Sequence, residues 1–399
     1  MKHPYHWRLS TVISVVILNL LLLWGIQKML RFDFIPRQQS SNSESTRMSA
    51  AGKNKPLLLY WGNTYEDAGL NIECSVTYDQ SRLPDADAVI FHFDKIRKRD
   101  MPWKNYRDKH QIFIWWCAEA PAIFGRNALR EFDGFFNWTW TYKRDADVQR
   151  LYGSRREILN FVTKGNQAVD KIISHKKKMA LWGVSHCGGS VGANKRMEYF
   201  KSLVAAGLDI KRFGGCFHFT EHIPRSFPAN FEPRWREYKF YFAFENALHC
   251  TDYITEKFWD NALRNDMVPV VWGPTKDDVL SVAPLDSFIH TDDFDSPAKL
   301  AEYLQFLDKN DDEYRKYFRW REDESMTDEK MIEMTKERHP HIHVQGSSKD
   351  LCRKLIENKE TKIIHSLTDE FINSEPQECV AVMNVQWKNQ TAVSYHILC

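Results

Sequence analysis

The 399-residue chain has no excess of one charge, no Cys-x-x-Cys pair and no visible internal repeat. Its 55 lysines and arginines are balanced by 53 aspartates and glutamates, which leaves a formal net charge of +2. Because broad nucleic-acid surfaces need a strongly basic face, this balance argues against a nucleic-acid partner. The lack of Cys-x-x-Cys pairs removes support for a zinc ribbon or a thioredoxin-like motif.

Long apolar runs are also scarce, and the clearest one covers residues 9–26 without a single charged side chain. It is about the shortest run that spans a bilayer, and no small-x-small cleavage site follows it. We therefore expect a cytoplasmic tail at residues 1–8, a transmembrane signal-anchor at residues 9–29 and a lumenal catalytic domain. Basic residues flank both ends of the run, so this orientation rests on the short N-terminal head.

Residues 30–55 are expected to form a flexible stem, since residues 38–55 contain no aromatic side chain. A lumenal domain would lie in an oxidising compartment, where the eight cysteines can form disulfides. Two Asn-x-Thr sequences, at Asn137 and Asn389, are compatible with N-glycosylation in that compartment. Asn389 is the better acceptor candidate, because Asn137 lies in the aromatic run FFNWTW, which a packed segment explains equally well.

From residue 56 onward, short apolar runs alternate with longer polar or helical segments. Such runs are typical of strands buried on both faces, which predicts parallel α/β sheets. The predicted strands are PLLLYWG, DAVIFHF and QIFIWW in a first series, and KMALWGVS, LDIKRFGG, YKFYFAFE, MVPVVWG and DSFIHT in a second. Helices are expected at residues 195–206, 254–264 and 297–310, the last one opened by a Ser-Pro pair.

Two such series, joined by a charged helical stretch, predict two Rossmann-like lobes facing a cleft. We place the first lobe at residues 56–170, the second lobe at residues 171–345 and a C-terminal tail at residues 346–399. Ligands of these folds bind at the carboxyl ends of the strands, so the site is expected between the lobes.

The densest group of chemically useful side chains surrounds the strand YKFYFAFE. Its carboxyl end delivers Glu245 and Asn246, and a polar loop then leads into a predicted helix. Thr255 or Asp252 is expected to cap this helix, which would bring free backbone N–H groups and Lys257 together, as a diphosphate site needs. Taken singly, each of these side chains could equally well only cap or solubilise the start of a helix.

Several longer stretches point further: YKFYFAFENALHCTDYITEKFW, VPVVWGP, FIHTDDFDSPAKLAEYLQFLDKNDDEYRKYFRWRE, DADAVIFHF, WWCAEAP, FNWTWTYKRDADV and KMALWGVSHCGG. Over roughly residues 56–325 they resemble the α1,3-fucosyltransferases of glycosyltransferase family 10. The resemblance implies the GT-B fold, with an acceptor-side first lobe and a second lobe that binds GDP-fucose. It also implies a type II protein of the Golgi membrane that transfers L-fucose, with inversion, to O3 of GlcNAc in N-glycan or LacNAc-type acceptors.

The resemblance assigns the donor site to residues of the second lobe. Departing GDP is negatively charged, and Lys257 and Arg196 occupy the family's positions on its diphosphate. The fucose carbon becomes positively charged in the transition state, which suits Glu256 as a catalytic acidic group, with Glu245 on the donor hydroxyls. The remaining implied donor contacts are Asn246, Tyr253, Tyr142 and Arg144, the last two shared with contacts between the lobes.

Inversion in a single step requires a base that deprotonates the acceptor hydroxyl. Glu119, in the sequence CAEAP, matches the family's glutamate and follows the strand QIFIWW, so it should reach the cleft from the first lobe. Its aromatic neighbours could raise its pKa, as a base requires. The alternative role for Glu119 is a charge at the start of a helix near Pro121.

Two disulfide pairings are expected among the eight cysteines. Cys187 and Cys216 flank one predicted strand–helix–strand unit and are the first candidate pair. The family ties its first lobe to its tail, which implies a bond from Cys74 to Cys352. Cys250 stands where the family often has proline, and Cys379 and Cys399 receive no assignment.

Metal and cofactor sites find little support in the sequence. Asp-Ala-Asp occurs at residues 85–87 and 145–147, the pattern by which metal-dependent transferases hold a nucleotide-sugar, but both copies read as turns or caps. The alternating histidines of residues 339–343 lack acidic or cysteine partners. We expect the reaction to require no cofactor and no metal ion, although Mn²⁺ or Mg²⁺ could stimulate its rate. A metal-dependent transferase and an inactive relative that acts as a lectin or chaperone are the rival hypotheses.

Overall fold

The computed structural model describes residues 55–62, 73–97, 101–102, 110–124, 127–162, 165–217, 233–327, 329–330, 333, 348–357, 362–377 and 379–380. The predicted signal-anchor and most of the stem lie outside these residues, as do Asn389, Cys399 and the histidines of residues 339–343. Contacts divide the chain into Met1–Lys53 and Asn54–Cys399, and every described residue belongs to the second unit. In the part of the chain that is described, no helix is both long enough and apolar enough to cross a membrane.

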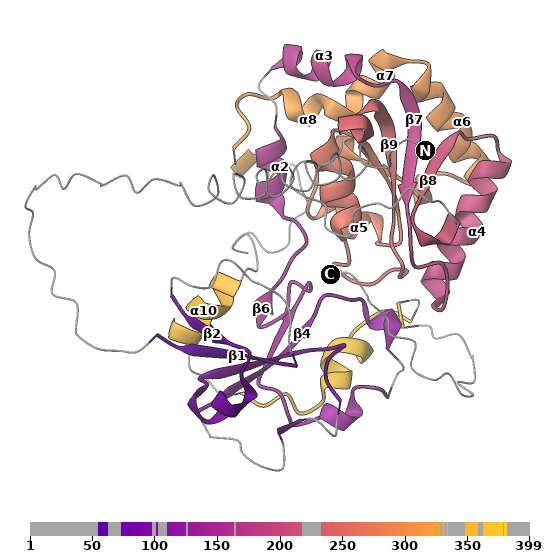
Figure 1. The fold of residues 1–399 in the computed structure, drawn as a ribbon. Helices are drawn as coiled ribbons and strands as arrows, with labels where there is room; N and C mark the ends of the chain where they lie inside the picture. The colour runs from indigo at the N-terminus through magenta and orange to yellow at the C-terminus, as the bar shows by residue number, and fades with distance from the viewer. Residues whose placement is uncertain are drawn as a thin grey trace, which may run out of the picture. The chain divides into compact units, whose positions relative to one another are not determined.

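The first sheet has six parallel strands in the order β2-β1-β3-β4-β5-β6 (Figure 1). Its strands are β1 (Leu57–Trp61), β2 (Ser75–Thr77), β3 (Ala88–His92), β4 (Ile112–Cys117), β5 (Trp138–Thr141) and β6 (Val148–Gln149). Trp115 of β4 packs into the apolar cluster on one face, and its neighbour Trp116 packs into the cluster on the other. Because both faces are covered, the strand sequences are continuous apolar runs rather than alternating ones.

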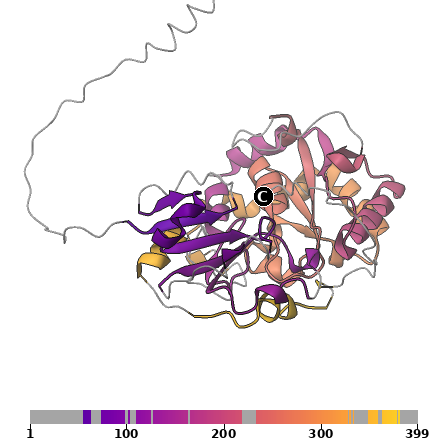
Figure 2. The ribbon, with the colours of Figure 1, turned by 60° about the horizontal axis from the view of Figure 1, so that its bottom comes forward.

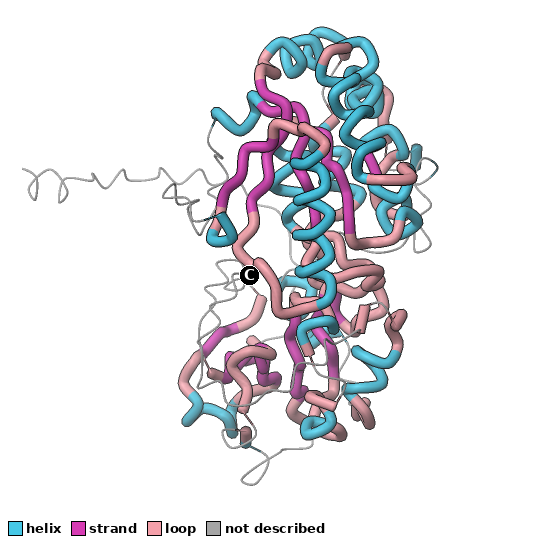
Figure 3. The backbone as a smooth tube through the Cα atoms, turned by 90° about the vertical axis from the view of Figure 1, so that its right-hand side faces the viewer, coloured by secondary structure: helices cyan, strands magenta, loops and turns pink. Residues whose placement is uncertain are grey.

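The second sheet has five parallel strands in the order β11-β10-β9-β7-β8. Its strands are β7 (Lys178–Gly183), β8 (Ile210–Phe213), β9 (Tyr238–Phe244), β10 (Val268–Trp272) and β11 (Ile289–His290). Helices cover both of its faces: α3 (Asn166–Ser174), α4 (Val191–Ala205), α6 (Pro297–Asp308) and α7 (Asp311–Arg315) on one, and α2 (Arg155–Phe161), η8 (Lys257–Ala262), η9 (Leu263–Asn265), α5 (Lys276–Leu280) and α8 (Arg319–Glu322) on the other. Figure 3 shows the two groups of strands separately, with loops between them.

The predicted α/β class with two parallel sheets is confirmed, and every predicted strand is present. The Ser-Pro start of the last predicted helix is also confirmed, because the Ser296 hydroxyl accepts from the backbone N–H of Lys299 and Pro297 opens α6. The helix predicted from residue 254 instead begins at Lys257, and the side chain of Glu256 before it makes no capping hydrogen bond. Of the two predicted caps, Thr255 is confirmed, because its hydroxyl accepts from the backbone N–H of Lys257 at 3.5 Å while it also donates to Glu245. The Asp252 carboxylate instead accepts from Arg144.

The predicted C-terminal tail packs against the first sheet (Figure 2). Helix α10 (Ser348–Glu357) contributes Leu351 and Leu355 to one apolar cluster, and the short helix η13 (Asp369–Asn373) contributes Phe371 to the other. The Cys187–Cys216 and Cys74–Cys352 disulfides are confirmed. A third bond, Cys250–Cys379, joins the loop after β9 to the tail and was not predicted.

Candidate active site

The loop after β9 lies directly against the start of helix α4. Ser190 caps α4 by accepting from the backbone N–H of Ala193, and its hydroxyl donates to the carbonyl of Asn246 at 3.0 Å. A Cβ atom added at Gly192 would lie 2.6 Å from the same carbonyl oxygen, so only glycine permits this approach. The carboxyl ends of β7 and β9 meet here, where the strand order reverses and ligands of doubly wound sheets bind.

Glu245, at the end of β9, is the centre of a buried polar cluster. Its Oε1 accepts from the backbone N–H of Thr255 at 2.9 Å and from the Thr255 hydroxyl at 2.8 Å. Its Oε2 lies 3.0 Å from Nζ of Lys257, and this ammonium lies 3.1 Å from Oε1 of Glu256. Lys257 is therefore held between two carboxylates instead of extending into solvent.

These contacts keep the lysine charged despite its surroundings. Burial alone would lower the pKa of Lys257, but Glu245 and Glu256 outweigh burial and hold this pKa above its usual range. Burial would likewise raise the pKa of Glu256, yet Lys257 brings it below the usual glutamate range. The ammonium and the Glu256 carboxylate are thus both ionised at neutral pH.

Arg196 projects from α4 and is only 2% exposed. Its Nη1 donates to the carbonyl of Phe244 at 2.8 Å and its Nη2 donates to the carbonyl of His186 at 2.6 Å. Nε is buried and has no hydrogen-bond partner within the described part of the chain. Arg196 therefore joins the end of β9 to the loop after β7, close enough to Glu245 and Lys257 to influence the charge of both.

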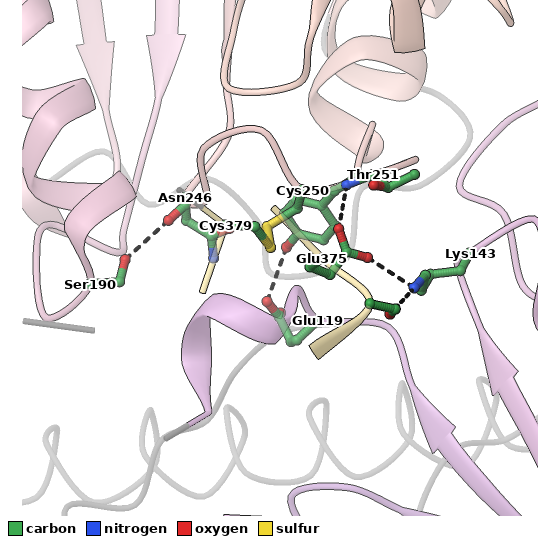
Figure 4. Close-up of a disulfide and its surroundings, with 10 residues drawn as sticks. Glu119, Lys143, Ser190, Asn246, Cys250, Thr251, Glu375 and Cys379 are labelled. Atoms are coloured by element: carbon green, nitrogen blue, oxygen red, sulfur yellow. Dashed lines mark hydrogen bonds and ion pairs between the residues drawn. A yellow bond between two sulfur atoms is a disulfide. The ribbon is translucent and has the colours of Figure 1, made fainter. Parts of the chain in front are cut away.

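Glu119 reaches the loop after β9 from the first sheet (Figure 4). It follows β4 and is 6% exposed, and its Oε2 accepts from the Tyr253 hydroxyl at 3.0 Å. The Tyr152 hydroxyl donates to the carbonyl of the preceding residue, Ala118, at 2.8 Å. The carboxylate predicted as a base therefore lies beside the donor-side cluster, held by residues of both lobes.

The surroundings of Glu119 favour a basic carboxylate. Burial raises its pKa above the usual glutamate range, and this effect outweighs the opposing influence of Lys257 and the hydrogen bond from Tyr253. A carboxylate that resists ionisation accepts a proton readily once it is ionised. Its pKa thus suits the predicted role, and the alternative role as a charge at a helix start loses support because only a three-residue turn, Pro121–Ile123, follows it.

Arg144 and Tyr142 form further contacts between the lobes. Nε of Arg144 donates to Oδ1 of Asp252 at 2.6 Å, and the Arg144 backbone N–H donates to Oδ2 at 2.9 Å. The ring of Tyr142 lies edge-on to the ring of Tyr253, with centroids 4.9 Å apart. Both partners, Asp252 and Tyr253, belong to the loop after β9, so the structure favours the interlobe part of the predicted role.

In both Asp-Ala-Asp sequences, the second aspartate accepts a hydrogen bond from a backbone N–H of the first lobe. Oδ2 of Asp87 accepts from the backbone N–H of Leu57 at 2.8 Å. Oδ2 of Asp147 accepts from the backbone N–H of Thr139 at 2.9 Å, and the Asp147 carboxylate pairs with Lys362. Over the described residues, no group of three His, Cys, Asp or Glu side chains could hold a metal ion.

Asn137 is buried in the first sheet. Its side-chain oxygen accepts from the backbone N–H of Phe113 at 2.8 Å, and its amide nitrogen donates to the carbonyl of Lys362 at 2.7 Å. Both halves of the amide are thus used by the fold, which confirms the packed-segment interpretation and leaves no accessible glycan acceptor at this position.

Sequence reasoning missed three participants that lie next to the predicted site. Tyr152 supports the backbone before Glu119, and Glu375 of the tail binds the loop after β9. The Cys250–Cys379 disulfide holds that same loop. A signal for the disulfide existed, because Cys250 replaces the family's proline while Cys379 had no partner.

Comparisons with known proteins match both lobes of this chain. The family model for the N-terminal part of fucosyltransferases matches residues 53–153, and that for the C-terminal part of glycosyltransferase family 10 (fucosyltransferase) matches residues 173–370. A 4-galactosyl-N-acetylglucosaminide 3-alpha-L-fucosyltransferase of Homo sapiens is 39% identical over 273 residues, or 67% of this chain and 70% of the relative. A 3-galactosyl-N-acetylglucosaminide 4-alpha-L-fucosyltransferase of Bos taurus is 37% identical over 255 residues, or 63% of this chain and 64% of the relative.

A crystal structure of an α1,3-fucosyltransferase is similar to this chain with a TM-score of 0.50 and 15% identity, over 81% of this chain and 95% of that one. At that identity, the likeness shows a shared fold. The two family-model matches and the similarity to the human relative show that the chain is a glycosyltransferase, an enzyme that transfers a sugar. The chain belongs to glycosyltransferase family 10 and is an enzyme of the α1,3-fucosyltransferase class.

Proposed function

We propose that this enzyme transfers L-fucose from GDP-fucose, with inversion, to O3 of GlcNAc in LacNAc-type or N-glycan acceptors. The two relatives are named for action on galactosyl-N-acetylglucosaminides, one at position 3 and the other at position 4. The choice of O3 follows the 3-fucosyltransferase, which is the more similar of these two relatives.

The single observation that carries the proposal is the position of Glu119. It is a buried carboxylate that reaches the lysine–glutamate cluster of the second lobe through Tyr253, with a pKa raised by burial. One carboxylate oxygen is engaged by Tyr253, and the second oxygen takes the proton of the acceptor hydroxyl as this hydroxyl attacks the fucose carbon. A single displacement of this kind inverts the configuration of the fucose carbon.

The second lobe supplies the charge that departing GDP needs. Lys257 and Arg196 provide two positive charges, which Glu245 and Glu256 balance. The diphosphate takes over part of the pairing of Lys257 from Glu256, whose side chain is 38% exposed. Glu256 then faces the positive charge that develops on the fucose carbon, while Asn246 and Tyr253 border the donor.

The proposed setting is the Golgi membrane, with the chain as a single-pass type II protein and its catalytic domain in the lumen. The apolar run at residues 9–26 and the three disulfides support this setting, since disulfides persist in oxidising compartments. Protease protection of a C-terminal tag in sealed Golgi vesicles tests it, and a tag that is cut in sealed vesicles would reverse the orientation.

Replacing Glu119 by Gln tests the proposed base. The amide keeps the shape and still accepts from Tyr253, but it cannot take a proton, so transfer should fall by at least about a hundredfold. GDP affinity should stay within about threefold of the wild type. The matched control is Glu131→Gln, an exposed glutamate of the same lobe, which should change neither quantity.

Replacing Lys257 by Ala tests the diphosphate site. GDP affinity should fall by at least about tenfold, because a charge-assisted contact to the diphosphate is lost. Lys276→Ala is the control, since this lysine of the same lobe is partly exposed and pairs with Asp293. Unchanged GDP affinity in Lys257→Ala would remove the role assigned to Lys257.

A further inference from the structure

The segment formed by the described residues 362–377 and 379–380 joins the first lobe to the loop after β9. Its later residues lie beyond the family match, which ends at residue 370. Its first part is fixed to the first lobe: the backbone N–H of Ile364 donates to the carbonyl of Phe136, and the ring of Phe371 lies edge-on to Trp115 with centroids 4.5 Å apart. We call this segment the C-terminal strap.

The far end of the strap grips the loop after β9 at two adjacent residues. Cys379 is bonded to Cys250, and Oε2 of Glu375 accepts from the backbone N–H of Thr251 at 2.8 Å (Figure 4). Oε1 of Glu375 lies 3.0 Å from Nζ of Lys143, a buried lysine of the first lobe. The Glu375 side chain has no exposed surface, so this carboxylate connects the loop to the first lobe inside the protein.

The gripped loop has a strained backbone. His249 and Asp252 have φ angles of 56° and 63°, in the left-handed region that costs energy for residues other than glycine. Such conformations persist where surrounding contacts impose them. The strap holds Cys250 and Thr251, the two residues between these strained positions.

The loop ends on the residue that touches the base. Tyr253 stands two positions after Thr251, and its hydroxyl donates to Glu119. Four consecutive residues, 250–253, therefore connect the strap to Glu119 through the disulfide and two hydrogen bonds. A shift of about 1 Å in the loop would break or bend the hydrogen bond to Glu119.

We propose that Glu375 and the Cys250–Cys379 bond are positioning residues of the catalytic site, which fix the loop so that Tyr253 orients Glu119. This inference rests on the proposed function of Glu119 as the base. Neither element touches substrate; both act through Tyr253. The strap thus makes the C-terminal part of this chain a support of its active site.

The test compares Glu375→Gln with Glu370→Gln in the full-length protein. Glu370 is the matched control, because it lies on the same segment but is exposed and pairs only at the surface with Lys362. In Glu375→Gln, kcat should fall between about ten- and a hundredfold while the KM for GDP-fucose stays within about threefold, as expected for a displaced base. Glu370→Gln should leave both values unchanged.

Coupling to Tyr253→Phe separates positioning from general destabilisation. If Glu375 acts through the Tyr253 hydroxyl, the double variant Glu375→Gln/Tyr253→Phe should be no slower than the slower of the two single variants. A purely structural role would make the fold-loss of kcat in the double variant equal to the product of the two single fold-losses. A product of this kind would overturn the proposal.

Amide hydrogen exchange provides a readout that does not require fucosyltransferase activity. The N–H groups of Thr251 and Tyr253 should exchange faster in Glu375→Gln and in Cys250→Ala/Cys379→Ala, and at the wild-type rate in Glu370→Gln. If Glu375→Gln does not fold, the exchange rates of Cys250→Ala/Cys379→Ala test the role of the strap. Unchanged exchange in the cysteine variant would overturn the strap's role, whereas faster exchange in a chain that transfers no fucose would refute only the proposed function.

Discussion

The fold buries Glu119, and burial destabilises the ionised form of its carboxylate. Burial raises its pKa above the value it has in the unfolded chain. Glu119 therefore contributes most to stability at pH values below its unfolded pKa, and this contribution is lost as the pH rises through its folded pKa. The hydrogen bond from Tyr253 opposes this rise of the pKa and is outweighed by burial.

Glu119→Gln should consequently stabilise the protein while it abolishes transfer. At pH 7 the free energy of unfolding should rise by about 1 kcal/mol, the usual size of relief at a functionally strained position. Below the unfolded pKa of glutamate, where the wild-type side chain is protonated in both states, the gain should vanish. Thermal unfolding at both pH values measures this, and a lower Tm of the variant at pH 7 would make Glu119 a structural residue.

Sequence reasoning at this scale was strongest for residues with a motif around them. Glu119, Glu245 and Lys257 were found because short, specific patterns contain them, and the structure brings all three together. The bond from the Thr255 hydroxyl to Glu245 could not be predicted, because a capping residue of a helix needs no such partner. Glu375 could not be predicted either, since its importance depends on a fold that brings it to Thr251 across 124 positions.

At the scale of elements, the start of α4 and the loop after β9 must touch for the site to exist. Parallel strands were predictable because they are buried on both faces and therefore apolar throughout. The close contact between Gly192 and Asn246 was not, because a glycine near a helix start has many explanations in a sequence. Only the distance of 2.6 Å from an added Cβ to the Asn246 carbonyl reveals it.

Gly192→Ala should push the loop after β9 away from α4. The clash involves backbone atoms of Asn246 and Ala247, which cannot rotate aside, so unfolding should become easier by about 1–3 kcal/mol. GDP affinity should fall as well, because Arg196 stands on α4 and Lys257 begins the helix that follows the displaced loop. Gly215→Ala is the control, since its added Cβ would meet nothing closer than 3.9 Å. Equal thermal stability and GDP affinity of both variants would mean that the contact is unimportant.

At the scale of the whole molecule, the tail closes the first lobe. The Cys74–Cys352 bond spans 278 positions and was predictable only because the family has the same tie. Helix α10 and the strap pack on opposite apolar clusters of the first sheet, so this lobe is built from segments far apart in the sequence. Composition and periodicity contain no information on such long-range packing.

Removing the Cys74–Cys352 bond should lower stability with little effect on catalysis. Cys74→Ala/Cys352→Ala frees a long loop in the unfolded chain, which costs about 2–5 kcal/mol of stability. The bond lies in the apolar cluster of α10, on the face of the first sheet away from Glu119 and Phe371, so kcat of the folded fraction should match the wild type. Thermal unfolding with parallel kinetics at a temperature where the variant is folded measures both, and a large drop in kcat there would connect α10 to the site.

The central claim is that Glu119 of the first lobe deprotonates an acceptor hydroxyl while the second lobe stabilises departing GDP. The most direct measurement is the NMR spectrum of the product that the full-length wild-type enzyme forms from GDP-fucose and N-acetyllactosamine in the presence of EDTA. We predict one fucose on O3 of GlcNAc, with its anomeric configuration opposite to that in the donor, and no product from Glu119→Gln. A retained configuration, or no transfer by the wild type, would contradict the account.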